Sequence, residues 1–117
     1  RKTGFHRALF AAAQDELVVT GTFLGGELVA AYWGMVSGDA SQLGILAHTP
    51  LLAEHSPGKL HIMQLSEHLL GEGLSVLDLT PGGDAWKERF ANDHDEVTEA
   101  TVYASDAARQ RAQRIAR

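Results

Sequence analysis

Two glycine turns divide the first half of this chain into three strand-like runs. Gly25-Gly26 separates a run rich in valine, threonine and phenylalanine, Leu17 to Leu24, from a second run, Leu28 to Ser37. Gly38-Asp39 then leads into a third run, Ser41 to His48. Because two-residue turns with glycine join antiparallel neighbours, we expect these runs to form an antiparallel meander.

The pattern changes after a predicted loop over residues 49–57. Gly58 to Leu70 carries apolar side chains at helical spacing, and the glycine at position 71 is expected to end that helix. Leu74 to Leu79 is a nearly continuous apolar run, which is typical of a strand buried on both faces beside a parallel neighbour. A parallel strand therefore joins the meander, and the sheet is mixed.

The remaining segments complete a single domain over residues 1–117. We expect a helix over residues 4–15, a last strand over Val97 to Ala104 and a helical, arginine-rich tail. Asp84 is predicted to cap a short helix that ends at Phe90. The predicted fold class is therefore α/β in the broad sense: helices pack on a mixed sheet, as in α+β proteins.

The start of the central helix has the residues of an anion site. Ser56 can cap free N–H groups, proline at 57 suits the first helical position, and Gly58 lets a ligand approach the backbone. The positive end of the helix dipole attracts phosphate, and Lys59 adds charge. An ordinary helix start without a ligand is the alternative interpretation.

Charged side chains follow the predicted parallel strand. Asp78 lies at its end, and Asp84 and Lys87 lie on the turn and short helix beyond it. A phosphate-binding helix start beside such a strand end indicates a site for a cofactor that carries phosphate.

Composition excludes several classes of site. The chain has no cysteine, so disulfides, thiolate metal sites and a cysteine nucleophile are excluded. Its net charge of −5 argues against a DNA-binding surface, and the arginines of residues 109–117 are interpreted as a solvated helix face. No apolar run is long enough to span a membrane. His61, Gln64 and His68 share a helical stripe, which we interpret as solvated rather than metal-binding.

These motifs, in this order, resemble the GNAT acyltransferase fold from its second helix onward. More closely, the chain resembles the CelD-type branch found beside cellulose and other polysaccharide biosynthesis genes, which is related to the FemABX peptidyltransferases. The resemblance rests on Gly26–Ala31, Ser56–Gly58 and Asp78–Phe90, where the family favours an aspartate strand, a Gly-x-Asp turn and a Tyr-Lys-x-x-Phe helix. Trp86 stands in the place of the tyrosine. The likeness covers residues 4–104 and implies a fragment that lacks the first strand and helix of the domain.

The resemblance implies acetyl-CoA or another acyl-CoA as co-substrate. In this fold two central strands part, and the acyl-pantetheine arm lies between them. Gly44 would then form a bulge, and backbone groups of Leu43 to Leu46 would pair with the amides of the arm. A strand glycine without a ligand is the alternative. The diphosphate would bind the amides of Gly58, Lys59 and Leu60 at the start of the central helix. The residues expected to hold acyl-CoA are Leu43, Gly44, Ile45, Ser56, Gly58, Lys59 and Leu60.

Acyl transfer needs a deprotonated acceptor and stabilisation of the leaving thiolate. On the resemblance, Asp78 would orient the acceptor or act as a base, and Lys87 would hold an anionic group or stabilise the leaving group. Asp84 and Trp86 would contact the substrate. The alternatives are an Asp78 bonded to a neighbouring helix start, a capping Asp84 and an exposed Lys87.

The predicted function is acyl-CoA-dependent transfer, of acetyl in the first instance, to a sugar, a polysaccharide precursor or another small amine or hydroxyl acceptor. Without a cysteine or a serine nucleophile motif, transfer would be direct. The alternatives are a FemABX-like transferase that uses aminoacyl-tRNA, disfavoured by the acidic balance, and an inert GNAT-like interaction module. A homodimer covering an unpaired edge strand, a cytoplasmic location and the absence of a metal are further expectations.

Overall fold

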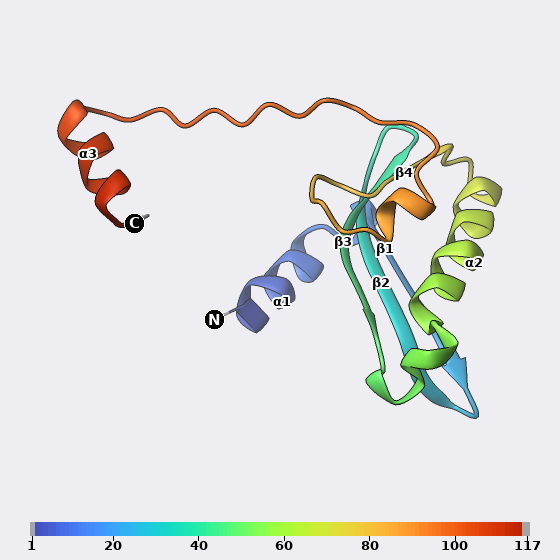
Figure 1. Cartoon of the computed structure of the whole chain (residues 1–117). Helices are drawn as coiled ribbons and strands as arrows, with labels where there is room; N and C mark the ends of the chain where they lie inside the picture. Colours follow the sequence, from blue (N-terminus) through green and yellow to red (C-terminus); the bar gives the residue numbers. More distant parts are fainter. Residues whose placement is uncertain (1, 116–117) are drawn as a thin grey trace.

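A four-stranded mixed sheet forms the centre of the molecule (Figure 1). The computed structural model describes residues 2–115. The strands lie in the order β1 (Leu17–Leu24), β2 (Glu27–Ser37), β3 (Ala40–His48) and β4 (Val76–Asp78). The first three strands are antiparallel and β4 is parallel to β3, so the predicted meander and its parallel neighbour are both confirmed.

The two predicted turns have the backbone that glycine permits. Gly25 and Gly26 have φ values of +57° and +84°, and Gly38 has a φ of +62°. Positive φ at both central residues, as at Gly25-Gly26, or at the first one, as at Gly38-Asp39, is typical of the two turn types that match the twist of a hairpin. The residue types at these turns therefore determine the register of the meander.

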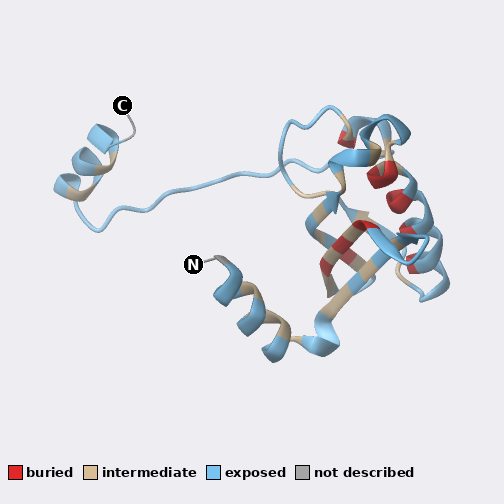
Figure 2. Cartoon of the chain, turned by 90° about the horizontal axis from the view of Figure 1, so that it is seen from below, coloured by how far each residue is buried: buried red, intermediate tan, exposed pale blue. Residues whose placement is uncertain are grey.

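Helix α2 (Pro57–Gly71) packs on one face of the sheet and makes the core with it. Tyr32 from β2 is buried together with Ile62, Leu65 and Leu69 from the helix. These buried residues gather where α2 meets the sheet (Figure 2). Apolar spacing along residues 58–70 correctly predicted this helix.

Helix α1 (Lys2–Ala12) contacts the opposite face. Trp33 follows Tyr32 in the strand, so its ring points away from α2. The ring lies edge-on to His6 and Phe10 of α1, with centroid separations of 5.8 and 5.7 Å. A short 3-10 turn, η1 (Gln14–Glu16), links α1 to the sheet.

The C-terminal part differs most from the prediction. The strand expected over Val97 to Ala104 is absent: this segment is extended, without secondary structure, and leads away from the sheet to α3 (Asp106–Ile115) (Figure 1). Val97 and Val102 are 69% and 92% exposed. β-branched residues stabilise a strand only where it finds a pairing edge and a packing face, and this segment has neither. Arg117 lies outside the described residues.

β4 is also shorter than predicted and less buried. It spans three residues rather than the six from Leu74 to Leu79, and Val76 is 46% exposed. The chain turns away at Thr80, whose φ of +61° lies in the left-handed region. Leu77 packs against the core, whereas Val76 and Asp78 on the other face are exposed. The prediction of burial on both faces was therefore wrong.

Candidate functional site

Gly44 forms the predicted bulge in β3. Gly34 pairs with Leu43 and Trp33 pairs with Ile45, so Gly44 has no partner across the ladder. A Cβ at this position would lie 2.5 Å from the Trp33 ring. The glycine is therefore required by the close approach of an indole from the neighbouring strand.

Beyond the bulge, β3 has a free edge within the described residues. β4 pairs only with residues Ala40–Gln42. At the other end of the strand, the Thr49 amide donates to the Val29 carbonyl oxygen at 2.9 Å. Because the direction of backbone groups alternates along an antiparallel strand, those of Leu46 and His48 point away from β2. Their N–H and C=O groups are available to a ligand at this edge.

The start of α2 differs from the predicted cap. Ser56 has left-handed backbone angles (φ 51°, ψ 54°), and its side chain makes no capping hydrogen bond. Its carbonyl oxygen instead accepts from the amides of Lys59 and Leu60 at 3.0 and 3.2 Å. The capping prediction for the Ser56 hydroxyl was therefore wrong. Of the three amides expected to bind diphosphate, only that of Gly58 has no partner within the described residues.

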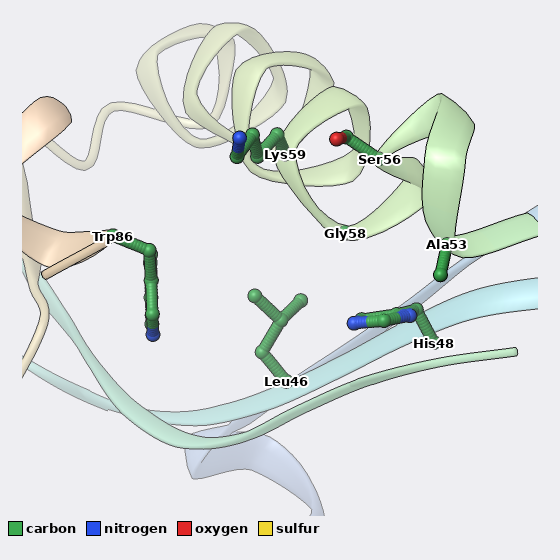
Figure 3. Close-up of a pocket in the computed structure, with 7 residues that line it drawn as sticks. All are labelled: Leu46, His48, Ala53, Ser56, Gly58, Lys59 and Trp86. Atoms are coloured by element: carbon green, nitrogen blue, oxygen red, sulfur yellow. The ribbon is translucent and has the colours of Figure 1, made fainter. Parts of the chain in front are cut away.

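A cavity of about 250 Å³ lies between the free edge of β3 and the start of α2 (Figure 3). Leu46 lies across from Lys59, and His48 and Trp86 stand at opposite ends. The short segment η2 (Pro50–His55) joins β3 to α2 and contributes Ala53. The lining residues are Leu46, His48, Ala53, Ser56, Gly58, Lys59 and Trp86.

Gly58 is buried at the His48 end of this cavity. A Cβ built on it would meet the His48 ring at 3.1 Å. The His48 Nδ1 lies 3.3 Å from the Thr49 carbonyl oxygen, which leaves Nε2 without a partner in the described part of the chain. The start of α2 and the His48 imidazole therefore border one end of the cavity, and Lys59 lies between the two ends (Figure 3). A helix start with a lysine nearby suits an anion.

Lys87 lies in η3 (Lys87–Arg89) and is buried rather than exposed. Its Nζ donates to the carbonyl oxygens of Thr80 and Pro81 at 3.2 and 3.5 Å. Asp84 Oδ2 lies 3.7 Å from the same ammonium. Asp84 does not cap the helix, because the N-cap residue of η3 is Trp86 and no side chain caps it. The capping prediction for Asp84 was wrong.

Asp78 holds the turn after β4. Its Oδ1 accepts from the Thr80 amide at 2.7 Å, rather than from a helix start. The neighbouring Tyr32 hydroxyl lies 2.8 Å from Ser41 Oγ in the core. Burial raises the pKa of Tyr32, the hydrogen bond with Ser41 opposes that shift, and the charge of Asp78 raises the pKa further. Asp78 therefore lies near the buried Tyr32–Ser41 pair, and its side chain is exposed.

The structure brings some predicted site residues together and separates others. Ser56, Gly58, Lys59 and Trp86 line the cavity. The residues that do not line it are Leu43, Gly44, Ile45, Leu60, Asp78, Asp84 and Lys87. Sequence reasoning missed His48 and Ala53. The position of His48, two residues beyond Leu46 on a strand with a free edge, is the signal that would have identified it.

His61 is buried, so the solvated stripe predicted for His61, Gln64 and His68 was wrong at its first member. The ring is 3% exposed and lies between Thr20 Oγ1, 2.9 Å from Nε2, and Thr22 Oγ1, 2.6 Å from Nδ1. Burial lowers the pKa of His61. Over residues 2–115, no group of three or more metal-ligating side chains is close enough to hold a metal, and no helix is long and apolar enough to cross a membrane.

Comparison with known proteins relates this geometry to a family. The sequence model of the acetyltransferase (GNAT) domain family matches residues 1–88. No curated protein matches the sequence.

Two solved acetyltransferase structures are similar to the chain, each with a TM-score of 0.59. An acetyltransferase from Trypanosoma brucei is 14% identical, and the match covers 85% of this chain and 77% of that one. An aminoglycoside acetyltransferase from an uncultured soil metagenomic sample is 15% identical, with coverage of 87% and 74%. At these identities the likeness shows the fold.

Proposed function

The chain belongs to the acetyltransferase (GNAT) domain family, and on that premise we propose that it binds acyl-CoA, acetyl-CoA in the first instance, in the cavity between β3 and α2. The acyl group passes to an amine or hydroxyl of a small acceptor. One observation carries this proposal: a free strand edge and a helix start converge on the same cavity.

The cavity has groups for both parts of the co-substrate. Backbone groups of Leu46 and His48, directed away from β2, suit the amides of a pantetheine arm. The Gly58 amide, the Lys59 ammonium and the positive end of α2 suit a diphosphate. Leu43, Gly44 and Ile45 do not line the cavity. They are proposed to contribute to binding through the bulge at Gly44, which directs β3 along the cavity.

The proposed chemistry is direct transfer. Acyl-CoA supplies a thioester carbonyl, which the acceptor nitrogen or oxygen attacks while the C–S bond breaks. We propose that Asp78, at the end of β4, and Asp84, beside Lys87, face the acceptor; both residues are exposed. Asp78 Oδ1 is bound to the Thr80 amide, so Oδ2 is the oxygen that would take the proton. Lys87 is proposed to act by ordering the loop, because its ammonium is bound to carbonyl oxygens.

The finer parts of the proposal concern the acceptor and the setting. A sugar or polysaccharide-precursor acceptor would follow from the CelD-type branch, and a homodimer and a cytoplasmic location stay predictions. Mobility-shift assays with aminoacyl-tRNA at moderate salt test the FemABX-like alternative. Unchanged biological output after Lys87→Ala and Asp78→Ala would favour the inert module.

A thermal-shift titration with coenzyme A and acetyl-CoA tests the proposal. Ligand at about a hundredfold over its Kd adds roughly 2.7 kcal/mol and raises the midpoint by several degrees. Gly58→Val is expected to remove the shift, because its side chain enters the cavity beside His48. Gly71→Val, at the other end of α2 where a Cβ meets nothing within 4 Å, is the matched control and should keep it. The absence of a shift in the unmodified protein would contradict the proposal.

A further inference from the structure

A buried ammonium fixes the loop that precedes Trp86. The Lys87 side chain is 11% exposed, an unusual degree of burial for a lysine on a short helix. Its Nζ binds two carbonyl oxygens and lies beside the Asp84 carboxylate. The residues around it, Thr80 to Asp84, therefore wrap one cation.

The wrapped loop uses unusual backbone angles. Thr80 has a φ of +61° and Gly82 a φ of +141°. A Cβ at Gly82 would lie 3.2 Å from Lys87 Nζ, so the loop approaches the ammonium closely. The Asp78 carboxylate holds the Thr80 amide from the other side. A non-glycine residue in the left-handed region persists only where its surroundings hold it, and here the two charged side chains do so.

Trp86 lies two residues after this loop and packs against an aromatic neighbour. Its ring lies edge-on to Phe90, with centroids 6.3 Å apart and planes at 64°. Both rings pack against the core. The indole is therefore joined through the backbone to the loop that Lys87 orders and is packed against Phe90, and it forms one end of the cavity (Figure 3).

The order of groups along the cavity indicates the role of its Trp86 end. Gly58 and His48 lie at the end that suits a diphosphate, which directs the acyl end of the co-substrate toward Trp86. We propose that Trp86, held in place by Lys87, is a wall that restricts the acyl group to short chains. Trp86 is then a specificity-determining residue and Lys87 a positioning residue. This inference rests on the proposed binding of acyl-CoA.

The positioning part is tested without ligand. Trp33→Phe leaves Trp86 as the single tryptophan, so its fluorescence reports on the wall alone. In that background, Lys87→Met should raise acrylamide quenching of Trp86, because the loop loses its cation. Arg89→Met removes a positive charge from the same short helix, where Arg89 is exposed, and should leave quenching unchanged. Equal quenching in the two variants would overturn the positioning role.

The specificity part is tested by calorimetric titration with coenzyme A, acetyl-CoA and octanoyl-CoA. We expect the unmodified protein to bind acetyl-CoA at least roughly tenfold more tightly than octanoyl-CoA. Trp86→Ala should bring the two affinities within about threefold, with Trp86→Phe intermediate, and Arg89→Met should keep the original ratio. If Trp86→Ala does not fold, Trp86→Phe tests the same prediction, because its ratio of affinities should lie between those of the unmodified protein and the alanine variant.

The outcomes separate this inference from the proposed function. If coenzyme A binds and the ratio of affinities is the same in the unmodified protein and both Trp86 variants, the wall is refuted and the proposed function stands. If no coenzyme A compound binds the unmodified protein, the proposed function fails and the wall fails with it.

Discussion

The buried hydrogen bonds of His61 offer a sharp test of what holds α2 to the edge of the sheet. Thr22 Oγ1 donates to Gln64 Oε1, so it accepts from His61 Nδ1–H, and Nε2 is left to accept from Thr20. Thr22→Val keeps the shape and β-branching of the side chain but removes the acceptor. The substitution therefore leaves a ring N–H, in a residue 3% exposed, without its partner.

The expected cost follows from that lost partner. An unsatisfied buried donor costs about 1–3 kcal/mol, against a total stability of about 5–15 kcal/mol for a domain of this kind. The thermal midpoint should fall by roughly 4–12 °C. Urea unfolding followed by far-UV circular dichroism measures the free energy directly.

The control is a threonine without such a partner. Thr98→Val makes the same chemical change in the exposed segment before α3 and should stay within about 0.5 kcal/mol of the unmodified protein. Replacing all three groups with apolar ones, as in Thr20→Val, Thr22→Val and His61→Leu together, should recover part of the loss, because no donor is then left unpaired. If Thr22→Val costs no more than Thr98→Val, the proposed network does not hold α2 to β1.

Two further predictions concern stability. Burial lowers the pKa of His61 below its ordinary 6.5. The contribution of the neutral ring to the free energy of unfolding is therefore complete above about pH 6.5 and is lost as the pH falls toward the folded-state pKa. Between about pH 7.5 and 5 the free energy of unfolding should fall less in His61→Asn than in the unmodified protein, and equal falls would contradict this prediction. Gly44→Ala places a Cβ 2.5 Å from the Trp33 ring and should lower the free energy of unfolding, measured in urea, by about 1–3 kcal/mol. Gly71→Ala, where the Cβ meets nothing within 4 Å, should leave it unchanged. Similar values for the two variants would show that the Trp33 ring moves aside freely.

Local chemistry made much of the fold predictable. The turns at positions 25, 26 and 38 require positive φ, which glycine adopts readily, so both hairpins could be predicted without knowledge of any tertiary contact. Gly44 inside an apolar strand correctly indicated a bulge. The apolar face of α2 was likewise readable from spacing alone, because burial of that face is what makes the helix stable.

Long-range contacts explain what the sequence could not show. Val97 to Ala104 has the residues of a strand, but nothing local says whether an edge awaits it. His61 was predicted to lie on a solvated face, and Lys87 to be a site cation or, alternatively, an exposed lysine. Their burial was not predicted, because their partners lie in other segments: a strand 39 to 41 residues away for the histidine and the loop after β4 for the lysine. Of the candidate site, the start of α2 was predictable, whereas His48 enters it only through the pairing of the sheet.

The bulge at Gly44 also changes the parity of β3. Ahead of it, the odd-numbered Ser41 and Leu43 face α2; past it, the even-numbered Leu46 and His48 do. Without one residue left out of the ladder, strict alternation would turn Leu46 and His48 toward α1 and place Ile45 over the core. The cavity thus depends on the number of residues in β3 as much as on their chemistry. The single unpaired residue, Gly44, determines which face of the strand receives a ligand.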